Sequence, residues 1–131
     1  MSDEIRTDSR YLHGDDLRRD GNWADIKLIV ESVGERDSAK DSQGKIIPGW
    51  PVTFEKTDKV LVMNQTNTKL AVAAIGTNKR SEWVGMPLTV YPAILDNCFG
   101  QTDVICLRIR VPDGVPKSFV SPKHMGKDLT K

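Results

Sequence analysis

Hydrophobic and polar residues alternate with a period of two over much of the middle of the chain. In residues 23–33, WADIKLIVESV, the apolar side chains of Ile26, Leu28 and Val30 fall on one side. The clearest alternation lies in residues 104–111, VICLRIRV. A period of two is typical of strands with one buried face, so both segments are predicted to be β-strands.

Three more strands are predicted around short polar connections. Residues 50–56, WPVTFEK, and residues 60–64, VLVMN, are β-rich runs separated by the turn 57–59, TDK, which is typical of a hairpin. Residues 86–91, MPLTVY, form a further strand, and residues 92–103 connect it to the last strand as a loop.

The period changes between the third and fourth strands, where a helix is predicted. Thr66 or Asn67 is the expected N-cap, and Gly76 is the residue type favoured just past a helix end. The apolar residues between them have helical spacing: Leu70, Ala71, Ala74 and Ile75.

The resulting order is strand, long loop, strand, tight turn, strand, helix, strand, loop, strand. This is the order of the OB-fold, so the predicted fold is mainly β: a small five-stranded barrel with the helix closing its lower end. Closure would also protect the edges of short strands. Another small β-barrel or an α+β sandwich with different strand pairing remains open at this point.

The length of 131 residues predicts one folded domain with two extensions. Residues 1–20 are expected to form a partly ordered N-terminal arm, and residues 21–112 the barrel. Residues 113–131 are predicted to be an extended or disordered basic tail, because closely spaced prolines deny regular structure there.

Charge and hydropathy exclude several classes of protein. Lys and Arg number 19 against 18 Asp and Glu, a net charge of +1, so no strong global positive field is expected. No run of about 18 apolar residues is present, which argues against a membrane-spanning helix. The polar, acidic start does not resemble a signal peptide, so a cytoplasmic location is expected, in a bacterial host if the chain is of phage origin.

Candidate catalytic and metal-binding patterns are absent from the sequence. Cys98 and Cys106 are eight positions apart and lack the close spacing of a zinc or redox site, so they are expected to be reduced structural thiols. His13 and His124 have no partner at ligand spacing. No phosphate-binding Gly-rich loop or nucleophile motif occurs. We therefore expect no enzyme activity, cofactor or metal.

Three runs carry a resemblance to a known family. They are LVMNQTNTKLAVAAIG at 61–76, EWVGMPLTVYP at 82–92 and ICLRIRVP at 105–112, and the similarity covers most of residues 11–112. The chain resembles a family of small phage and prophage proteins of uncharacterised role. The resemblance implies an association with phage replication and recombination.

Two positions depart from the pattern of that family. Gln65 and Met86 stand where lysines are expected, and both changes remove positive charge. The resemblance therefore does not carry phosphate contacts at these two positions.

An OB-fold binds single-stranded nucleic acid on its second and third strands and on the loops joining strands one to two and four to five. Binding needs aromatic rings for stacking and cations that follow the backbone. The first of these loops offers Arg36, Lys40 and Lys45 and ends at Trp50, and the second offers Phe99. Acidic residues beside Arg36 and Lys40 leave the first loop nearly neutral, so a simple solvated loop is the alternative interpretation.

The last strand adds Arg108 and Arg110, which alternation places on its outward face. Guanidinium groups on an open sheet hold phosphates or stack on bases, and they equally pair with nearby carboxylates. The residue pattern favours the ion-pair interpretation, because edge charges also protect a sheet from unwanted pairing.

The leading hypothesis is a single-stranded DNA-binding OB-fold protein acting in phage DNA replication or recombination. The alternative is a protein-interaction module, an adaptor or inhibitor of a host or phage enzyme, that uses the same barrel without nucleic acid. Homo-oligomerisation through an open strand edge is a third alternative.

Overall fold

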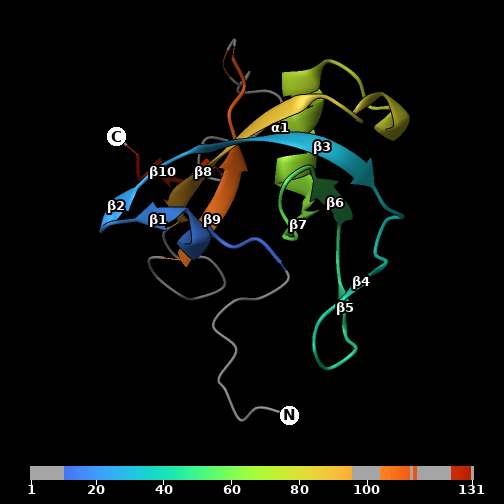
Figure 1. Cartoon of the computed structure of the whole chain (residues 1–131), viewed down its shortest axis with the longest axis horizontal. Coiled ribbons are helices and arrows are strands. Elements are labelled where there is room, and N and C mark those ends of the chain that lie inside the picture. The colour runs from blue at the N-terminus through green and yellow to red at the C-terminus, as the bar shows by residue number, and fades with distance from the viewer. Residues whose placement is uncertain (1–10, 96–103, 113, 115–124, 131) are drawn as a thin grey trace.

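The computed structural model describes residues 11–95, 104–112, 114 and 125–130, and it is mainly β (Figure 1). The longer elements are β3 (Ile26–Val33), β6 (Trp50–Phe54), β7 (Val60–Met63), α1 (Gln65–Ile75), β8 (Pro87–Leu95) and β9 (Val104–Ile109). The short elements are η1 (Gly14–Leu17), β1 (Arg18–Arg19), β2 (Asn22–Trp23), β4 (Ala39–Lys40), β5 (Ile46–Ile47), η2 (Arg80–Glu82) and β10 (Lys127–Asp128).

The long strands form one antiparallel sheet in the order β7-β6-β3-β8-β9. Along the chain, the long strands and the helix follow one another as predicted: three strands, the helix α1, and two further strands. Strand β8 is long enough to pair with β3 over its first half and with β10 over its second half, along the same edge. Strand β9 occupies the opposite edge of β8.

The predicted closure into a barrel is not confirmed, because no pairing joins β7 to β9 among the described residues. The N-terminal segment, residues 11–17, lies between these two strands instead. Tyr11 forms a parallel bridge with Val60, and the Leu12 N–H donates to the Val60 carbonyl over 2.8 Å. Gly14 lies against β9, where an added Cβ would be 2.5 Å from a methyl carbon of Ile105.

The core lies between the sheet, the helix and the N-terminal segment. Alternate residues of each long strand contribute, as the period of two predicted, and Leu17 and Trp83 join from outside the sheet. Helix α1 contacts β7, β8 and β9 and buries Leu70 and Ala71. The strand residues that belong to this hydrophobic core are Leu28, Val30, Val52, Phe54, Leu61, Met63, Leu88, Val90, Leu107 and Ile109.

Helix α1 begins earlier than predicted. Asn64 is the N-cap, and its side chain accepts a hydrogen bond from the backbone N–H of Asn67 over 2.8 Å. The prediction of Thr66 or Asn67 as cap was wrong because both lie inside the first helical turn, and several neighbouring residues can serve as caps. The predicted end is confirmed: Gly76 adopts φ +96°, the left-handed conformation favoured there.

Two other segments differ from expectation. Strand β8 continues through Pro92, whose carbonyl accepts from the Leu129 N–H at the edge between β3 and β10. Proline has no N–H to donate to a neighbouring strand. This is tolerated at Pro92 because the residue faces the gap between β3 and β10 on that edge. The segment predicted as an extended or disordered tail contains β10, which pairs with Ala93 and Ile94.

Candidate functional site

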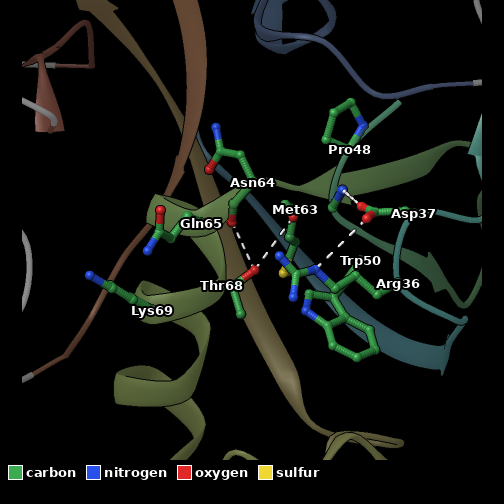
Figure 2. A pocket seen from close by; sticks show the side chains of 10 residues that line it. Arg36, Asp37, Pro48, Trp50, Met63, Asn64, Gln65, Thr68 and Lys69 are labelled. Carbon is green, nitrogen blue, oxygen red and sulfur yellow. Dashed lines mark hydrogen bonds and ion pairs between the residues drawn. The ribbon is translucent and has the colours of Figure 1, made fainter. Parts of the chain in front are cut away.

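A pocket lies where β6 begins, β7 ends and α1 starts (Figure 2). Its volume is about 470 Å³, and we call it the Trp50 pocket. Trp50, the first residue of β6, pairs with Met63, the last residue of β7. The lining residues are Arg36, Asp37, Pro48, Gly49, Trp50, Met63, Asn64, Gln65, Thr68 and Lys69.

The Trp50 ring is half-buried and held in place from one side. It packs partly against the core, and the Arg80 guanidinium lies 5.6 Å from the ring centroid, within the range of a cation–π contact. Arg80 is itself fixed, because it donates to the Gly34 carbonyl over 2.9 Å and pairs with Glu35 over 2.8 Å. The ring is therefore a positioned aromatic surface at the edge of the pocket.

A clamp at the base of residues 34–49 shapes the adjoining wall. The Asp37 N–H donates to the Gly49 carbonyl, and the Gly49 N–H donates to the Asp37 carboxylate, each over 2.8 Å. Gly49 adopts φ +128°, and a Cβ there would lie 2.2 Å from the Met63 carbonyl oxygen. Only glycine fits this approach, so the loop is anchored directly beside Trp50.

The charges around the pocket are mixed, since its lining contains Arg36 and Lys69 together with Asp37. Arg36 and Lys69 line it from opposite sides, from the loop and from α1 (Figure 2). Arg36 is largely exposed, and its Nε is 4.0 Å from the Asp37 carboxylate, which makes a weak surface pair. The first turn of α1 carries no acidic residue, so the positive end of the helix dipole adds to these cations.

Two of the predicted loop cations lie elsewhere. Lys40 lines a second cleft, which is described below, on the outer side of β6. Lys45 is exposed near the tip of the β4–β5 hairpin, which projects from the body (Figure 1), and it lines neither of these two sites. Phe99 lies outside the described residues. The structure therefore joins Arg36 with Trp50 but does not gather all of the predicted residues at one place.

Arg108 lies on the face of β9 opposite to the core residues Leu107 and Ile109, as alternation predicts, but it is not exposed there. Its side chain is buried, with 4% of the residue exposed, and its Nη1 donates to the Leu107 carbonyl over 2.8 Å. It pairs across strands with Tyr91, which is also buried.

Arg110 is held by ion pairs, the interpretation that the sequence pattern favoured. It contacts Asp25 over 2.9 Å, Asp128 over 2.8 Å and the Thr130 hydroxyl over 2.7 Å. Its guanidinium also lies 4.2 Å from the Tyr91 ring centroid. This cluster joins three segments of the chain.

The same cluster shifts three pKa values. Partial burial lowers the pKa of Arg110, but hydrogen bonds to Asp128 and Asp25 outweigh it and raise that pKa above its ordinary value. Burial raises the pKa of Asp128, but hydrogen bonds from Arg110 and Thr130 outweigh burial and lower that pKa below its ordinary value. Burial raises the pKa of Tyr91. The cluster stays charged at neutral pH and stabilises the fold.

Sequence reasoning missed Lys69 and Arg80 at the Trp50 pocket. Lys69 lies four residues after Gln65, on the same face of the helix. Its place beside Gln65 could therefore have been predicted from the sequence. Arg80 had no such signal, because its contacts with Gly34, Glu35 and Trp50 all join residues distant in sequence.

Comparisons with protein-family models, with curated proteins and with solved structures gave no match. Within the described part of the chain, no three His, Cys, Asp or Glu side chains are grouped so as to hold a metal ion. No helix among the same residues has the length and apolar character needed to cross a membrane.

Proposed function

We propose that the protein is an OB-type, single-stranded DNA-binding protein and that the strand binds at the Trp50 pocket. The sheet order β7-β6-β3-β8-β9 supports an OB-type arrangement. So does the position of α1, which lies between β7 and β8, the third and fourth long strands in chain order. In that arrangement β6 and β7 are the second and third strands, which carry the ligand in OB-folds. The N-terminal segment takes the place of direct pairing between β7 and β9.

The observation that carries the proposal is the placement of Trp50. Its ring lines the Trp50 pocket at the start of β6, and the Arg80 guanidinium lies 5.6 Å from the ring centroid. Every nucleobase has a flat face that stacks on an aromatic ring, so such a platform binds single strands without reading sequence. A duplex keeps its bases stacked internally, so the platform favours unpaired strands.

The charges support binding of moderate strength. Arg36 and Lys69 flank the pocket, and Arg80 lies behind the ring, but Glu35 and Asp37 offset part of this charge. Few phosphates are therefore neutralised, and affinity depends only modestly on salt. The proposed role is binding rather than catalysis, and the setting in phage replication or recombination rests on the family resemblance.

The proposal is tested by fluorescence anisotropy of a labelled oligothymidine at low salt. Replacing Trp50 with leucine keeps an apolar side chain against the core but removes the stacking surface, so Trp50→Leu weakens binding by about 5- to 100-fold. Trp50→Phe retains most of the affinity. No binding of the wild-type chain at about 50 micromolar would remove the proposal, since nonspecific contacts register in that range.

Matched charge variants separate the pocket from the general surface. Lys69→Gln reduces the slope of log affinity against log salt by about 0.7, the value for one lost phosphate contact on a single strand. Lys45→Gln, on the exposed hairpin, leaves the slope unchanged. Equal effects of the two variants would mean that net charge, not the pocket, binds the strand.

A second candidate is a protein-interaction module. The carboxylates Glu35 and Asp37 favour it, because they interrupt the positive surface beside Trp50. A partner retained from nuclease-treated host lysate, together with no oligonucleotide binding, supports this candidate. A replication or recombination protein of phage or host is the expected kind of partner.

A further inference from the structure

A second cleft lies on the outer side of the sheet, and its floor is a row of residues across neighbouring strands. Tyr11 bridges Val60, Val60 pairs with Thr53, and Thr53 pairs with Ser32. Paired residues on neighbouring strands point to the same face, so these four side chains form one row. The volume above the row is about 360 Å³, and we call it the Tyr11 cleft.

The β4–β5 hairpin forms the roof of the Tyr11 cleft. Lys40 and Ala39 line the cleft from above, and the Tyr11 hydroxyl donates to the Lys40 carbonyl over 2.5 Å. Ser38 is fixed by donating to the Glu35 carbonyl over 2.7 Å. The tyrosine ring is thus tied at its hydroxyl to the hairpin and at its backbone to β7, and its orientation is set before any ligand arrives.

The walls combine the three kinds of group that a nucleotide needs. The Tyr11 ring and Pro51 offer apolar surface for a base. The hydroxyls of Ser32 and Thr53, which lie 2.5 Å apart, are uncharged groups that hydrogen-bond to base or sugar edges as donor or acceptor. Lys40 supplies one cation for a phosphate. Among the described residues, the lining of the cleft contains no carboxylate.

The Tyr11 cleft and the Trp50 pocket share two structural elements. Residues 34–49 wall both, with Arg36 and Asp37 at the pocket and Ser38 and Lys40 at the cleft. Strand β6 also passes from one to the other, since Trp50 lines the pocket and Thr53 lines the cleft. Three residues of strand separate these positions by roughly 10 Å along β6, and the odd offset places Trp50 and Thr53 on opposite faces of the sheet. An oligonucleotide therefore reaches both sites by passing round the end of the sheet beside residues 34–49.

We propose that the Tyr11 cleft is a second nucleotide subsite, in which a base of the strand that binds at Trp50 packs on Tyr11. This inference rests on the proposed function and extends it by assigning the N-terminal segment to the binding surface. It predicts that an oligonucleotide long enough to occupy both sites binds more tightly than one that fills the Trp50 pocket alone.

The test compares Tyr11→Leu with Tyr11→Phe by anisotropy on an oligothymidine of about twelve nucleotides. Loss of the ring in Tyr11→Leu weakens binding by about 5- to 30-fold, the scale of one stacked base, and Tyr11→Phe stays nearer to wild type. Oligothymidine carrying 5-iododeoxyuridine then crosslinks to Tyr11 on irradiation, and peptide mapping locates the adduct.

A separate pair of variants leaves the N-terminal segment untouched. Lys40 accepts the hydrogen bond from the Tyr11 hydroxyl through its backbone carbonyl, so Lys40→Gln removes the cation while that hydrogen bond remains. Lys40→Gln lowers the salt slope by about 0.7, and Lys45→Gln on the same hairpin does not. If Tyr11→Leu and Lys40→Gln bind as wild type while Trp50→Leu is weakened, the second subsite is wrong and the proposed function stands. Absence of any binding by the wild-type chain overturns both.

Discussion

Single residues decide the shape of the Trp50 pocket, and Gly49 shows this most directly. It combines a left-handed backbone with a close approach to the Met63 carbonyl, immediately before the stacking residue. Asp37 also has a positive φ, of 59°, and its carboxylate closes the clamp by accepting from Gly49. The pocket wall is therefore built from backbone geometry that few other residues tolerate.

Replacing Gly49 with alanine is expected to destabilise the protein by at least about 2 kcal/mol, because strained backbone and steric overlap add. Thermal unfolding followed by circular dichroism measures this as a lower Tm. Gly44→Ala is the matched control, since Gly44 also has a positive φ but has no atom within 4 Å of an added Cβ. A loss of stability no larger than that of the control would contradict the role of the Met63 contact.

At the scale of elements, the start of α1 joins the fold to the pocket. The Asn64 cap sets the first turn, and that turn carries Gln65, Thr68 and Lys69 into the pocket lining. The Thr68 hydroxyl donates to the Asn64 carbonyl over 2.8 Å, which further fixes the turn. Position and orientation of Lys69 thus depend on one capping interaction.

Asn64→Ala removes the cap and is expected to cost about 1 kcal/mol, whereas Asn64→Ser retains most of the stability. Chemical denaturation gives the free energy of unfolding of each variant. An alanine variant as stable as the wild type would show that the 2.8 Å contact with Asn67 contributes nothing measurable.

Strand pattern and helix could be predicted because both depend on local periodicity. Leu28, Val30, Leu107 and Ile109 are buried as the period of two required. The same period places Arg108 on the face of β9 opposite to Leu107 and Ile109, but this side chain is buried. Burial on that face depends on how separate segments of the chain pack, which local periodicity does not specify.

The candidate site was predictable only in part for the same reason. Trp50 and Arg36 flank one loop and were identified from composition and position. Arg80 and Tyr11 reach the two sites through contacts with distant residues, at Trp50 and Lys40 respectively. Their roles depend on how the sheet brings separate segments together.

At the scale of the whole molecule, the Arg110 cluster fastens the C-terminal residues to the sheet. It joins Asp25 after β2, Arg110 after β9 and Asp128 in β10. Each pair is partly exposed, so the strength of the cluster comes from its several contacts acting together. Its removal should loosen β10 before the rest of the sheet.

This cluster predicts a dependence of stability on pH. The lowered pKa of Asp128 means that its contribution is complete above its ordinary value of 3.8 and is lost as pH falls through the lower folded value. Asp128→Asn should therefore reduce Tm at pH 7, and the difference from wild type should shrink towards pH 2. Asp58→Asn, at an exposed position, serves as control. If the difference in Tm between Asp128→Asn and the wild type stays the same in acid, the charge of Asp128 is not its cause.

The position of the N-terminal segment between β7 and β9 also bears on how the protein is made. Gly14 leaves the ribosome early, but Ile105 and Cys106, which it contacts, are synthesised late. Until β9 has emerged from the ribosome, the nascent chain lacks the surface on which residues 11–17 rest. Contacts between residues so distant in sequence form slowly, so a ribosome that pauses before β9 holds a chain in which residues 11–17 have no docking surface.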